Sequence, residues 1–255
     1  MSPEAPVTDA KLAPYRRKRD FTKTAEPSGR GKVARSNALR FVIQKHAASR
    51  LHFDLRLEYD GVFRSWAVPK GPSLDPHDRR LAVQVEDHPL DYGDFEGTIP
   101  EGEYGGGAVM LWDRGYWAPE DSGENIGRAL EKGELKFVME GERMHGGWVL
   151  VRLKGDERGR SNWMLIKHRD LAAVAGDRGG PSNNDRSVAS GRTMAAIAAG
   201  KGRSAKPFVT ATGAAAGAQW RGDRAEEAGS AKTSVKVGRP GPKPKVAPKP
   251  KAARK

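Results

Sequence analysis

The stretch from Leu51 to Glu58 alternates strictly between apolar and polar residues, and this pattern constrains the fold more than any other feature. Its members are Leu51, Phe53, Leu55 and Leu57 on one side and His52, Asp54, Arg56 and Glu58 on the other. Successive side chains of a strand point to opposite faces, so the pattern predicts a strand with one apolar and one polar face. The Asp60-Gly61 pair that follows is typical of a tight hairpin turn. We therefore expect a hairpin between Leu51–Tyr59 and Val62–Val68, with its apolar face on a core.

Similar short stretches rich in Val, Leu, Trp and Met recur along the chain, each bounded by Gly or charged turns. They predict strands at Phe41–His46, Arg80–Asp87, Ala108–Trp112, Gly115–Trp117, Glu134–Met139, Trp148–Leu153 and Trp163–His168. No long amphipathic helix lies among them, so the pattern favours an all-β fold, either a small antiparallel barrel or a sandwich. Five Trp fall in this region, where they can fill the core: Trp66, Trp112, Trp117, Trp148 and Trp163.

The remaining segments indicate little regular structure. Residues 1–14 have no periodicity and are predicted to be disordered, and residues 93–107 are rich in Gly and acid, which favours turns and a bulge. This segment lacks the Gly-Lys-Ser/Thr ending of a nucleotide-binding P-loop. Residues 173–230 are predicted to be a linker of low order with one short helix at Met194–Ala199. Residues 231–255 repeat Pro and Lys, so we expect a disordered tail.

Composition excludes several kinds of chemistry. The chain has no Cys, which rules out disulfides, thiolate zinc sites and a Cys nucleophile, and which fits a reducing cytoplasm. It has no run of about 18 apolar residues, so we expect no membrane-spanning helix. The net charge is +13, and the last 25 residues supply +9 of it with nine Lys or Arg and no acid. A balance this basic points to nucleic acid as the partner, with the tail attracted to phosphate backbones.

The polar face of the alternating strand has two interpretations. Two imidazoles and a carboxylate on adjacent strands, His46, His52 and Asp54, could hold a divalent metal with open coordination positions. Arg56 could then bind a phosphate oxygen on that metal, because its planar fork matches phosphate. The alternative is that this charged face is simply solvated, as is usual for an alternating strand, since short motifs often occur by chance.

Four runs of the sequence resemble a known family: RDFTKTAEP, FVIQKHAASRLHFDLRLEYDGVFRSWAVPKGPS, RLAVQVEDHPLDYGDFEGTIPEGEYGGG and WMLIKHRD. In this order they are similar to the 3′-phosphoesterase module of bacterial DNA ligase D, over residues 15–172. The resemblance implies a compact β-barrel and a manganese-dependent enzyme that heals DNA 3′ ends during double-strand-break repair by end joining. It implies removal of a terminal ribonucleoside to leave a 3′-phosphate, then hydrolysis of that phosphate to leave a 3′-hydroxyl. Mixed N/O ligands accept other divalent metals as well as manganese.

The resemblance also implies a role for each residue that matches the family's motifs. The metal ligands are His46, His52 and Asp54. The residues around the scissile phosphate are Arg56, Arg80, His88 and Tyr92, with His52 close to both groups. The residues of the N-terminal arm needed for activity are Arg19, Asp20 and Glu26. The arm is expected to fold over the site, where its two carboxylates either orient a ligand histidine or recognise the terminal ribose.

Elementary chemistry agrees with these roles. A metal acts as a Lewis acid on a phosphate oxygen, and Arg56 and Arg80 offset the charge that develops there. His88 is expected to titrate near neutrality, so that it donates a proton to the leaving oxygen or stabilises the transition state. Tyr92 is expected to give a hydrogen bond to the phosphate.

The family's best-known form joins this module to polymerase and ligase modules, for which 255 residues leave no room. The sequence thus predicts a free-standing enzyme of the bacterial cytoplasm, associated with the nucleoid. Its expected partners are DNA 3′ ends, a separate DNA ligase and a Ku-type end-binding protein. Two non-enzymatic alternatives remain: an accessory factor that binds DNA ends by charge alone, and a chromatin-like packaging protein built on the basic tail.

Overall fold

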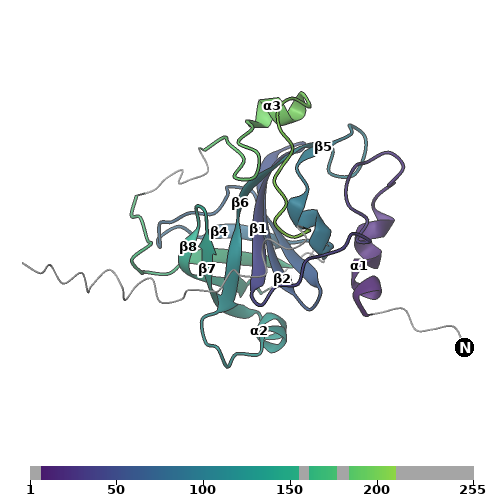
Figure 1. Ribbon diagram of the computed structural model, residues 1–255. Helices are drawn as coiled ribbons and strands as arrows, with labels where there is room; N and C mark the ends of the chain where they lie inside the picture. The colour runs from purple at the N-terminus through teal and green to yellow at the C-terminus, as the bar shows by residue number, and fades with distance from the viewer. Residues whose placement is uncertain (1–6, 155–160, 177–183, 211–255) are drawn as a thin grey trace, which may run out of the picture. The chain divides into compact units, whose positions relative to one another are not determined.

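Nine strands and three short α-helices make up the computed structural model, which describes residues 7–154, 161–176 and 184–210 (Figure 1). The strands are β1 (Leu39–Ala47), β2 (Leu51–Tyr59), β3 (Val62–Val68), β4 (Arg80–Gln84), β5 (Gly97–Ile99), β6 (Gly107–Pro119), β7 (Glu134–Gly141), β8 (His145–Arg152) and β9 (Asn162–Lys167). The helices are α1 (Val7–Arg17), α2 (Ile126–Lys132) and α3 (Met194–Ala198), with a short 3₁₀ helix η1 (Leu90–Asp94). None of these helices is long and apolar enough to cross a membrane.

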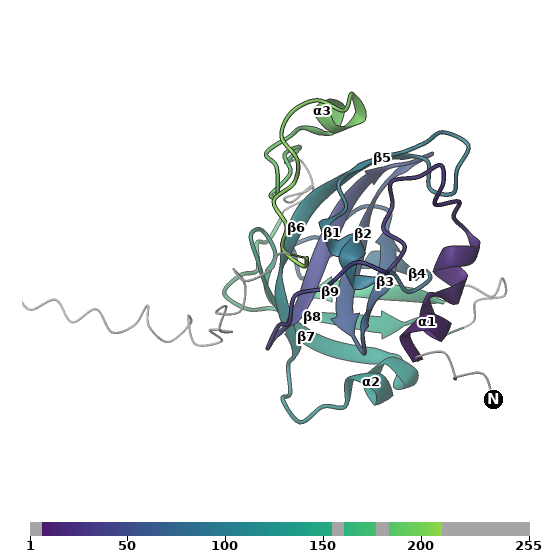
Figure 2. The same cartoon turned by 45° about the vertical axis from the view of Figure 1, so that its right-hand side comes forward.

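Eight of the strands close into an antiparallel barrel. Their order is β1-β2-β3-β4-β9-β8-β7-β6, and β6 pairs with β1 to complete the ring. Closure leaves none of these eight strands at the edge of a sheet. The predicted all-β barrel is confirmed, and the sandwich alternative is excluded. α2 and α3 lie at opposite ends of the barrel, and α1 lies beside it (Figure 1 and Figure 2).

Two local predictions between η1 and β7 are wrong. The sequence predicts only turns and a bulge for residues 93–107, yet β5 forms there and pairs with β6. The two strands predicted on either side of Asp113 are a single strand, β6. Asp113 does not end the strand, because it is buried and accepts four main-chain N–H groups, from residue 114 and from the turn at residues 142–144.

The predicted hairpin is confirmed, and it separates the two faces of β2. Asp60 and Gly61 both have positive φ, 51° and 77°, as a type I′ turn requires. The apolar side chains that face the barrel interior and are buried are Phe53, Leu55 and Leu57. Leu51, at the start of the strand, is 51% exposed instead. The interior also takes up the five tryptophans that the sequence assigns to a core, all of which are buried.

The outer face of β1, β2 and β3 is covered by three segments from outside the barrel. They are the arm (residues 7–38), residues 85–99 and the strap (residues 184–210). Tyr15 of the arm packs in one apolar cluster with Tyr92, and Val209 of the strap packs with Val42 and Phe63. Side chains on the outer face of these strands are therefore shielded from water.

The predicted disorder of residues 1–14 is wrong for residues 7–14, which belong to α1. Leu12 and Tyr15, almost one helical turn apart, are both buried, and Tyr15 packs with Tyr92 and with Val109 of β6. Lys11 forms an ion pair with Asp60 of the hairpin turn. The apolar side of the helix is narrow and Pro14 lies within it, so the sequence shows no helical periodicity. Residues 1–6 lie outside the described residues.

The low order predicted for residues 173–230 is wrong for the strap, which is hydrogen-bonded to the barrel. The Asp94 carboxylate accepts the main-chain N–H groups of Phe208, Val209 and Thr210. Glu96 accepts hydrogen bonds from Ser190 and Arg192. The short helix predicted near residue 194 is present as α3. Residues 177–183, 211–230 and the predicted tail at 231–255 lie outside the described residues.

Candidate metal centre and phosphate site

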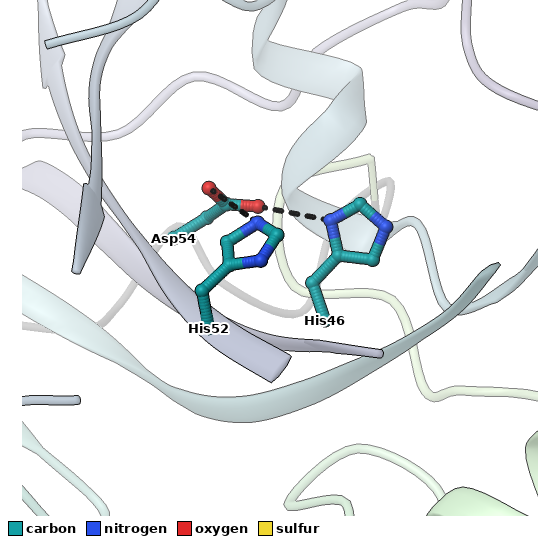
Figure 3. Close-up of side chains that lie close together, drawn as sticks. All are labelled: His46, His52 and Asp54. Carbon is teal, nitrogen blue, oxygen red and sulfur yellow. Dashed lines mark ion pairs between the residues drawn. The ribbon is translucent and has the colours of Figure 1, made fainter. Parts of the chain in front are cut away.

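The register between β1 and β2 brings the three predicted metal ligands together on the outer face of the barrel. His46 lies directly opposite His52, and Asp54 follows two residues later on the same face. The Asp54 carboxylate lies 3.5 Å from Nδ1 of His46 and 3.7 Å from Nε2 of His52 (Figure 3). One donor atom from each residue lies within 4.8 Å of the other two. They form the one such group of three found in the described chain.

Main-chain carbonyls fix which nitrogen of each imidazole faces the carboxylate. His46 Nε2 lies 2.8 Å from the carbonyl oxygen of Gly105, and His52 Nδ1 lies 2.9 Å from that of Arg50. Because a carbonyl only accepts, each of these nitrogens carries the proton when the ring is neutral. The lone pairs of His46 Nδ1 and His52 Nε2 therefore both point towards Asp54. Metal-binding histidines are held by the same kind of hydrogen bond.

Asp54 supplies the negative charge of this group. Burial by itself raises the pKa of Asp54, but the Arg56 guanidinium and the two imidazoles outweigh it and hold the pKa below its usual range. The carboxylate is therefore ionised at neutral pH. Two imidazole nitrogens with a carboxylate oxygen are a donor set that divalent transition metals accept. The three residues thus fit a metal on the chemistry and direction of their ligand atoms.

Arg56 lies next to the ligand group, and one of its guanidinium nitrogens has no hydrogen-bond partner in the described part of the chain. Its Nε donates to Gln44 (2.8 Å) and its Nη2 to Asp54 (3.2 Å), while its guanidinium lies over the Tyr92 ring. Nη1 is buried and has no hydrogen-bond partner among the described residues. A buried unpaired donor is costly, so this N–H is available to an anionic oxygen. Asp54 and Arg56 are only 6% and 2% exposed, which rules out the solvated face as an interpretation of this strand.

His88 lines the same cavity as the ligand group, and its imidazole is neutral. Its Nδ1 lies 2.9 Å from the carbonyl oxygen of Glu86, and its Nε2 lies 3.3 Å from Nη2 of Arg19. Burial, together with the Arg56 and Arg19 guanidinium groups, lowers the pKa of His88 well below its usual value. The expectation that His88 titrates near neutrality is therefore wrong for this cavity without a bound anion. Nε2 is then a hydrogen-bond acceptor.

The arm contributes an ion pair and orients Tyr92. Arg19 Nε donates to the Glu26 carboxylate (2.8 Å), and Arg19 Nη1 donates to Glu86 (3.1 Å). The Tyr92 hydroxyl donates to Glu26 as well (3.1 Å). Burial and the Glu26 charge raise the pKa of Tyr92 well above its usual value, so the phenol keeps its proton. The arm folds over the site as the sequence predicts, with Arg19 and Glu26 in place.

Arg80 does not reach this site. Asp54 pairs with Ala67, and Ala67 pairs with Val83, so Val83 lies on the site face of β4. Arg80, three residues before Val83, lies on the opposite face, and its Nη2 donates to Asp78 (2.6 Å). The phosphate contact predicted for Arg80 has no geometric support in this structure.

Asp20 also lies outside the site. Its side chain is 44% exposed and accepts hydrogen bonds from the main chain and hydroxyl of Thr22. Asp20 thus closes a turn of the arm, while Glu26 enters the site. The two arm carboxylates, which the sequence cannot tell apart, differ in this respect, and the functional role of each stays a prediction.

A cavity of about 310 Å³ joins these groups. Its polar and aromatic lining is Arg19, His46, His52, Asp54, Arg56, Glu86, His88, Tyr92 and Tyr104. The sequence gives no role to Glu86 or Tyr104, nor to Gln44, which anchors Arg56. For Gln44 a signal exists, because it lies two residues before His46 on the same face of a strand. Tyr104 belongs to a Gly-rich turn that carries no such pattern.

Comparisons with known proteins agree with this geometry. Residues 44–152 match the family model described as the DNA ligase D 3′-phosphoesterase domain. The chain is 56% identical over 170 residues to the multifunctional non-homologous end joining protein LigD of Pseudomonas aeruginosa, covering 66% of this chain and 20% of that protein. It is 41% identical over 172 residues to the LigD protein of Mycolicibacterium smegmatis, covering 66% of this chain and 22% of that one.

A third relative, the LigD protein of Mycobacterium tuberculosis strain H37Rv, is 44% identical over 153 residues, which cover 60% of this chain and 20% of that protein. The chain therefore spans about a fifth of the length of these relatives. The matched region contains β2 to β8, with the metal ligands and the phosphate-site residues from Arg56 to Tyr92. The barrel of this chain belongs to the DNA ligase D 3′-phosphoesterase domain family.

Proposed function

We propose that this chain is a metal-dependent phosphoesterase that heals DNA 3′ ends. It removes a terminal ribonucleoside to leave a 3′-phosphate and then hydrolyses that phosphate to leave a 3′-hydroxyl. One observation carries the proposal: two imidazole lone pairs and a carboxylate converge beside the unpaired N–H of Arg56, within one cavity. A cation on one side and a guanidinium on the other suit a phosphate ester.

His46, His52 and Asp54 would hold the metal, which we propose to be manganese. When bound, it supplies Lewis-acid activation of a phosphate oxygen. Arg56 donates Nη1–H to a second oxygen of the same phosphate and offsets the charge that develops there. Gln44 keeps the guanidinium plane in position for this contact, because it binds Nε.

His88 and Tyr92 act on the opposite side of the phosphate. The Tyr92 hydroxyl keeps its proton and donates a hydrogen bond to Glu26, so a hydrogen bond to the phosphate requires this O–H to turn from Glu26 to a phosphate oxygen. A bound phosphate offsets the two guanidinium charges that depress the pKa of His88. The imidazole can then take up a proton, hold it at Nε2 and deliver it to the leaving oxygen.

The setting follows from the relatives, whose names place them in non-homologous end joining. We propose that this chain acts on DNA ends in the same kind of repair, with a DNA ligase and a Ku-type end-binding protein as partners. The net charge of +13 favours a polyanionic substrate.

The test is end processing of a labelled primer–template that bears one 3′-terminal ribonucleotide, with and without manganese. The wild-type chain should shorten the primer first to a 3′-phosphate and then to a 3′-hydroxyl, only when metal is present. His52→Ala should abolish both steps. The matched control is His145→Ala, because His145 is exposed and lies far from the ligand group in the sequence and on another strand.

Two outcomes would contradict the proposal. If the chain binds DNA ends tightly but no divalent metal produces shortening, it is a non-catalytic end-binding factor. If His52→Ala and His145→Ala process ends equally well, the activity does not come from this site.

A further inference from the structure

Tyr104 lies on a tightly built turn at the edge of the proposed active site. The turn runs from Pro100 to Gly107 between β5 and β6, and it is closed by main-chain hydrogen bonds from Glu103 to Pro100 and from Gly106 to Glu103. A Cβ on Gly107 would lie 2.0 Å from a main-chain oxygen of β1, so the turn is packed directly on the barrel. The carbonyl of Gly105 in the same turn orients the metal-ligand candidate His46.

The Tyr104 ring is open to solvent and faces the site. Tyr104 is 47% exposed, and it is the one exposed large apolar residue of the described chain that lines the site cavity. Lys18 donates to its hydroxyl (3.1 Å) and lies 4.6 Å from the ring centre. The ring is thus held in place by the arm while much of its surface is free. Exposed aromatic rings are the usual platforms for unpaired bases.

A second, larger cavity adjoins the first at this turn, and Tyr104 is among the residues that line the first. The volume of the second cavity is about 650 Å³, and it shares Ala48, Ile99 and Gly105 with the site cavity. Its polar groups are the hydroxyls of Ser49 and Thr98, the carboxylates of Glu101 and Glu103, and the main chain of the glycines. Glu103 is paired with Lys23 of the arm (3.4 Å), so the net negative charge of the lining comes from Glu101. This charge disfavours the phosphates of a DNA backbone, whereas a nucleoside beyond the scissile phosphate carries no charge of its own. The volume is in the range of small-molecule sites.

We propose that Tyr104 and this second cavity bind the terminal nucleoside that the enzyme removes, with the base stacked on the Tyr104 ring. The inference rests on the proposed function. It assigns a part of the site that is used in ribonucleoside removal but not in hydrolysis of the 3′-phosphate. The first reaction has a terminal nucleoside beyond the scissile phosphate, and the second does not. Tyr104 therefore serves ribonucleoside removal and has nothing to stack on during hydrolysis of a 3′-phosphate.

The experiment compares Tyr104→Ala and Tyr104→Phe on two substrates, DNA ending in a 3′-ribonucleotide and DNA ending in a 3′-phosphate. Tyr104→Ala should raise KM for ribonucleoside removal about ten- to a hundredfold, the range expected for the loss of one base–aromatic stack. Its rate on the 3′-phosphate should stay close to the wild-type rate. Tyr104→Phe keeps the ring and should behave as the wild type on both substrates. Leu81→Ala, which changes another exposed apolar residue, is the control.

Binding separates this inference from the proposed function. Anisotropy of labelled DNA should show tighter binding to an end with a terminal base than to an end with a terminal abasic ribose, and Tyr104→Ala should remove that difference. If Tyr104→Ala removes this difference in binding but the wild type processes no end, the stacking site is supported and the phosphoesterase proposal is contradicted. Equal loss of both reactions in Tyr104→Ala would mean that Tyr104 only supports the turn that orients His46, and the inference would be overturned. No loss in either reaction would overturn it as well.

Discussion

Buried charges around the site are arranged in pairs, of which Arg19–Glu86 joins the arm to residues 85–99. Arg19 of the arm pairs with Glu26 and Glu86, and Arg56 of β2 pairs with Asp54. Removing one member of such a pair leaves the other charge buried without full compensation. Each of these residues therefore supports the fold as well as the chemistry, and substitutions have to be read for both effects.

Glu26→Gln tests whether a buried charge of the arm supports both the fold and the activity. The change keeps an oxygen acceptor but removes the charge that holds Arg19 and Tyr92. We expect the free energy of unfolding to fall by about 1–3 kcal/mol and end processing to weaken, measured by urea denaturation and by the primer assay. Glu131→Gln is the matched control, since Glu131 is exposed on α2, and it should change neither quantity appreciably. A loss of activity in Asp20→Asn with unchanged stability would mean that Asp20 acts on the DNA and not through the fold.

His88 should make stability depend on pH. Its pKa is lowered in the folded chain, so below about pH 6.5 the unfolded chain binds more protons. Stability of the metal-free protein should therefore fall as pH decreases from about 7 to 5, with a slope of up to about 1.4 kcal/mol per pH unit from this group. Urea denaturation across this range should show a smaller slope for His88→Gln. His145→Gln, at an exposed site, should keep the wild-type slope, and an unchanged slope in His88→Gln would contradict the prediction.

At the scale of elements, the strap and η1 form one unit. Asp94 ends η1 and accepts three consecutive main-chain N–H groups of the strap together with the Thr210 hydroxyl. Tyr92 lies in the same short helix. The position of a phosphate-site residue thus depends on a segment that lies beyond residues 44–152, which match the family model.

Asp94→Ala should release this contact. Three N–H groups of the strap lose their acceptor, so we expect unfolding to become easier by about 1–3 kcal/mol and activity to fall as Tyr92 loses its support. Hydrogen exchange is the direct measurement, and the amides of residues 208–210 should lose protection. Asp121→Ala removes an acceptor from an exposed turn instead and should leave these amides protected. Protection that survives Asp94→Ala would show that apolar packing of Val209 alone holds the strap.

The sequence predicts the elements whose partners are adjacent and misses those whose partners are distant. The β2–β3 hairpin follows from alternation and a two-residue turn, so the sequence alone predicts its bounds and nearly all of its buried face. α1 is held by the burial of Leu12 and Tyr15, and Tyr15 packs with Tyr92. The strap is held by the carboxylates of Asp94 and Glu96, about a hundred residues earlier in the chain. No local pattern records such contacts. The metal ligands could be found because one strand carries two of them, whereas their tautomers depend on carbonyls that any residue possesses.

At the scale of the whole molecule, metal binding should stabilise the fold. His46 and His52 belong to different strands, so the site exists only when β1 and β2 are paired. Manganese at about 100 times its dissociation constant should add about 2.7 kcal/mol and raise the melting temperature by roughly 5–10 °C. Differential scanning fluorimetry should show this rise in the wild type and in His145→Ala but not in His52→Ala. Equal melting temperatures with and without metal would count against the site.

The basic tail should govern how strongly DNA binding depends on salt. Residues 231–255 carry nine of the Lys and Arg residues and no acid, and each phosphate contact releases counterions. Deleting this segment should weaken DNA affinity at low salt and reduce the slope of log affinity against log salt by up to about 8. An affinity at low salt that does not change on deletion would show that the folded part alone binds DNA.

The carbonyl groups that orient His46 and His52 also limit what side-chain mutagenesis can reveal. Gly105 and Arg50 act through oxygens that every residue has, so an alanine scan would record nothing at Arg50 even though its carbonyl selects the nitrogen that faces Asp54. Gly105 would respond to replacement, because its φ of +79° disfavours a side chain. A scan would then show that Gly105 matters, but it would not show that the carbonyl oxygen of Gly105 is the group that contacts His46. Reading such data correctly requires replacement of the peptide group itself, for instance by an ester in a semisynthetic chain.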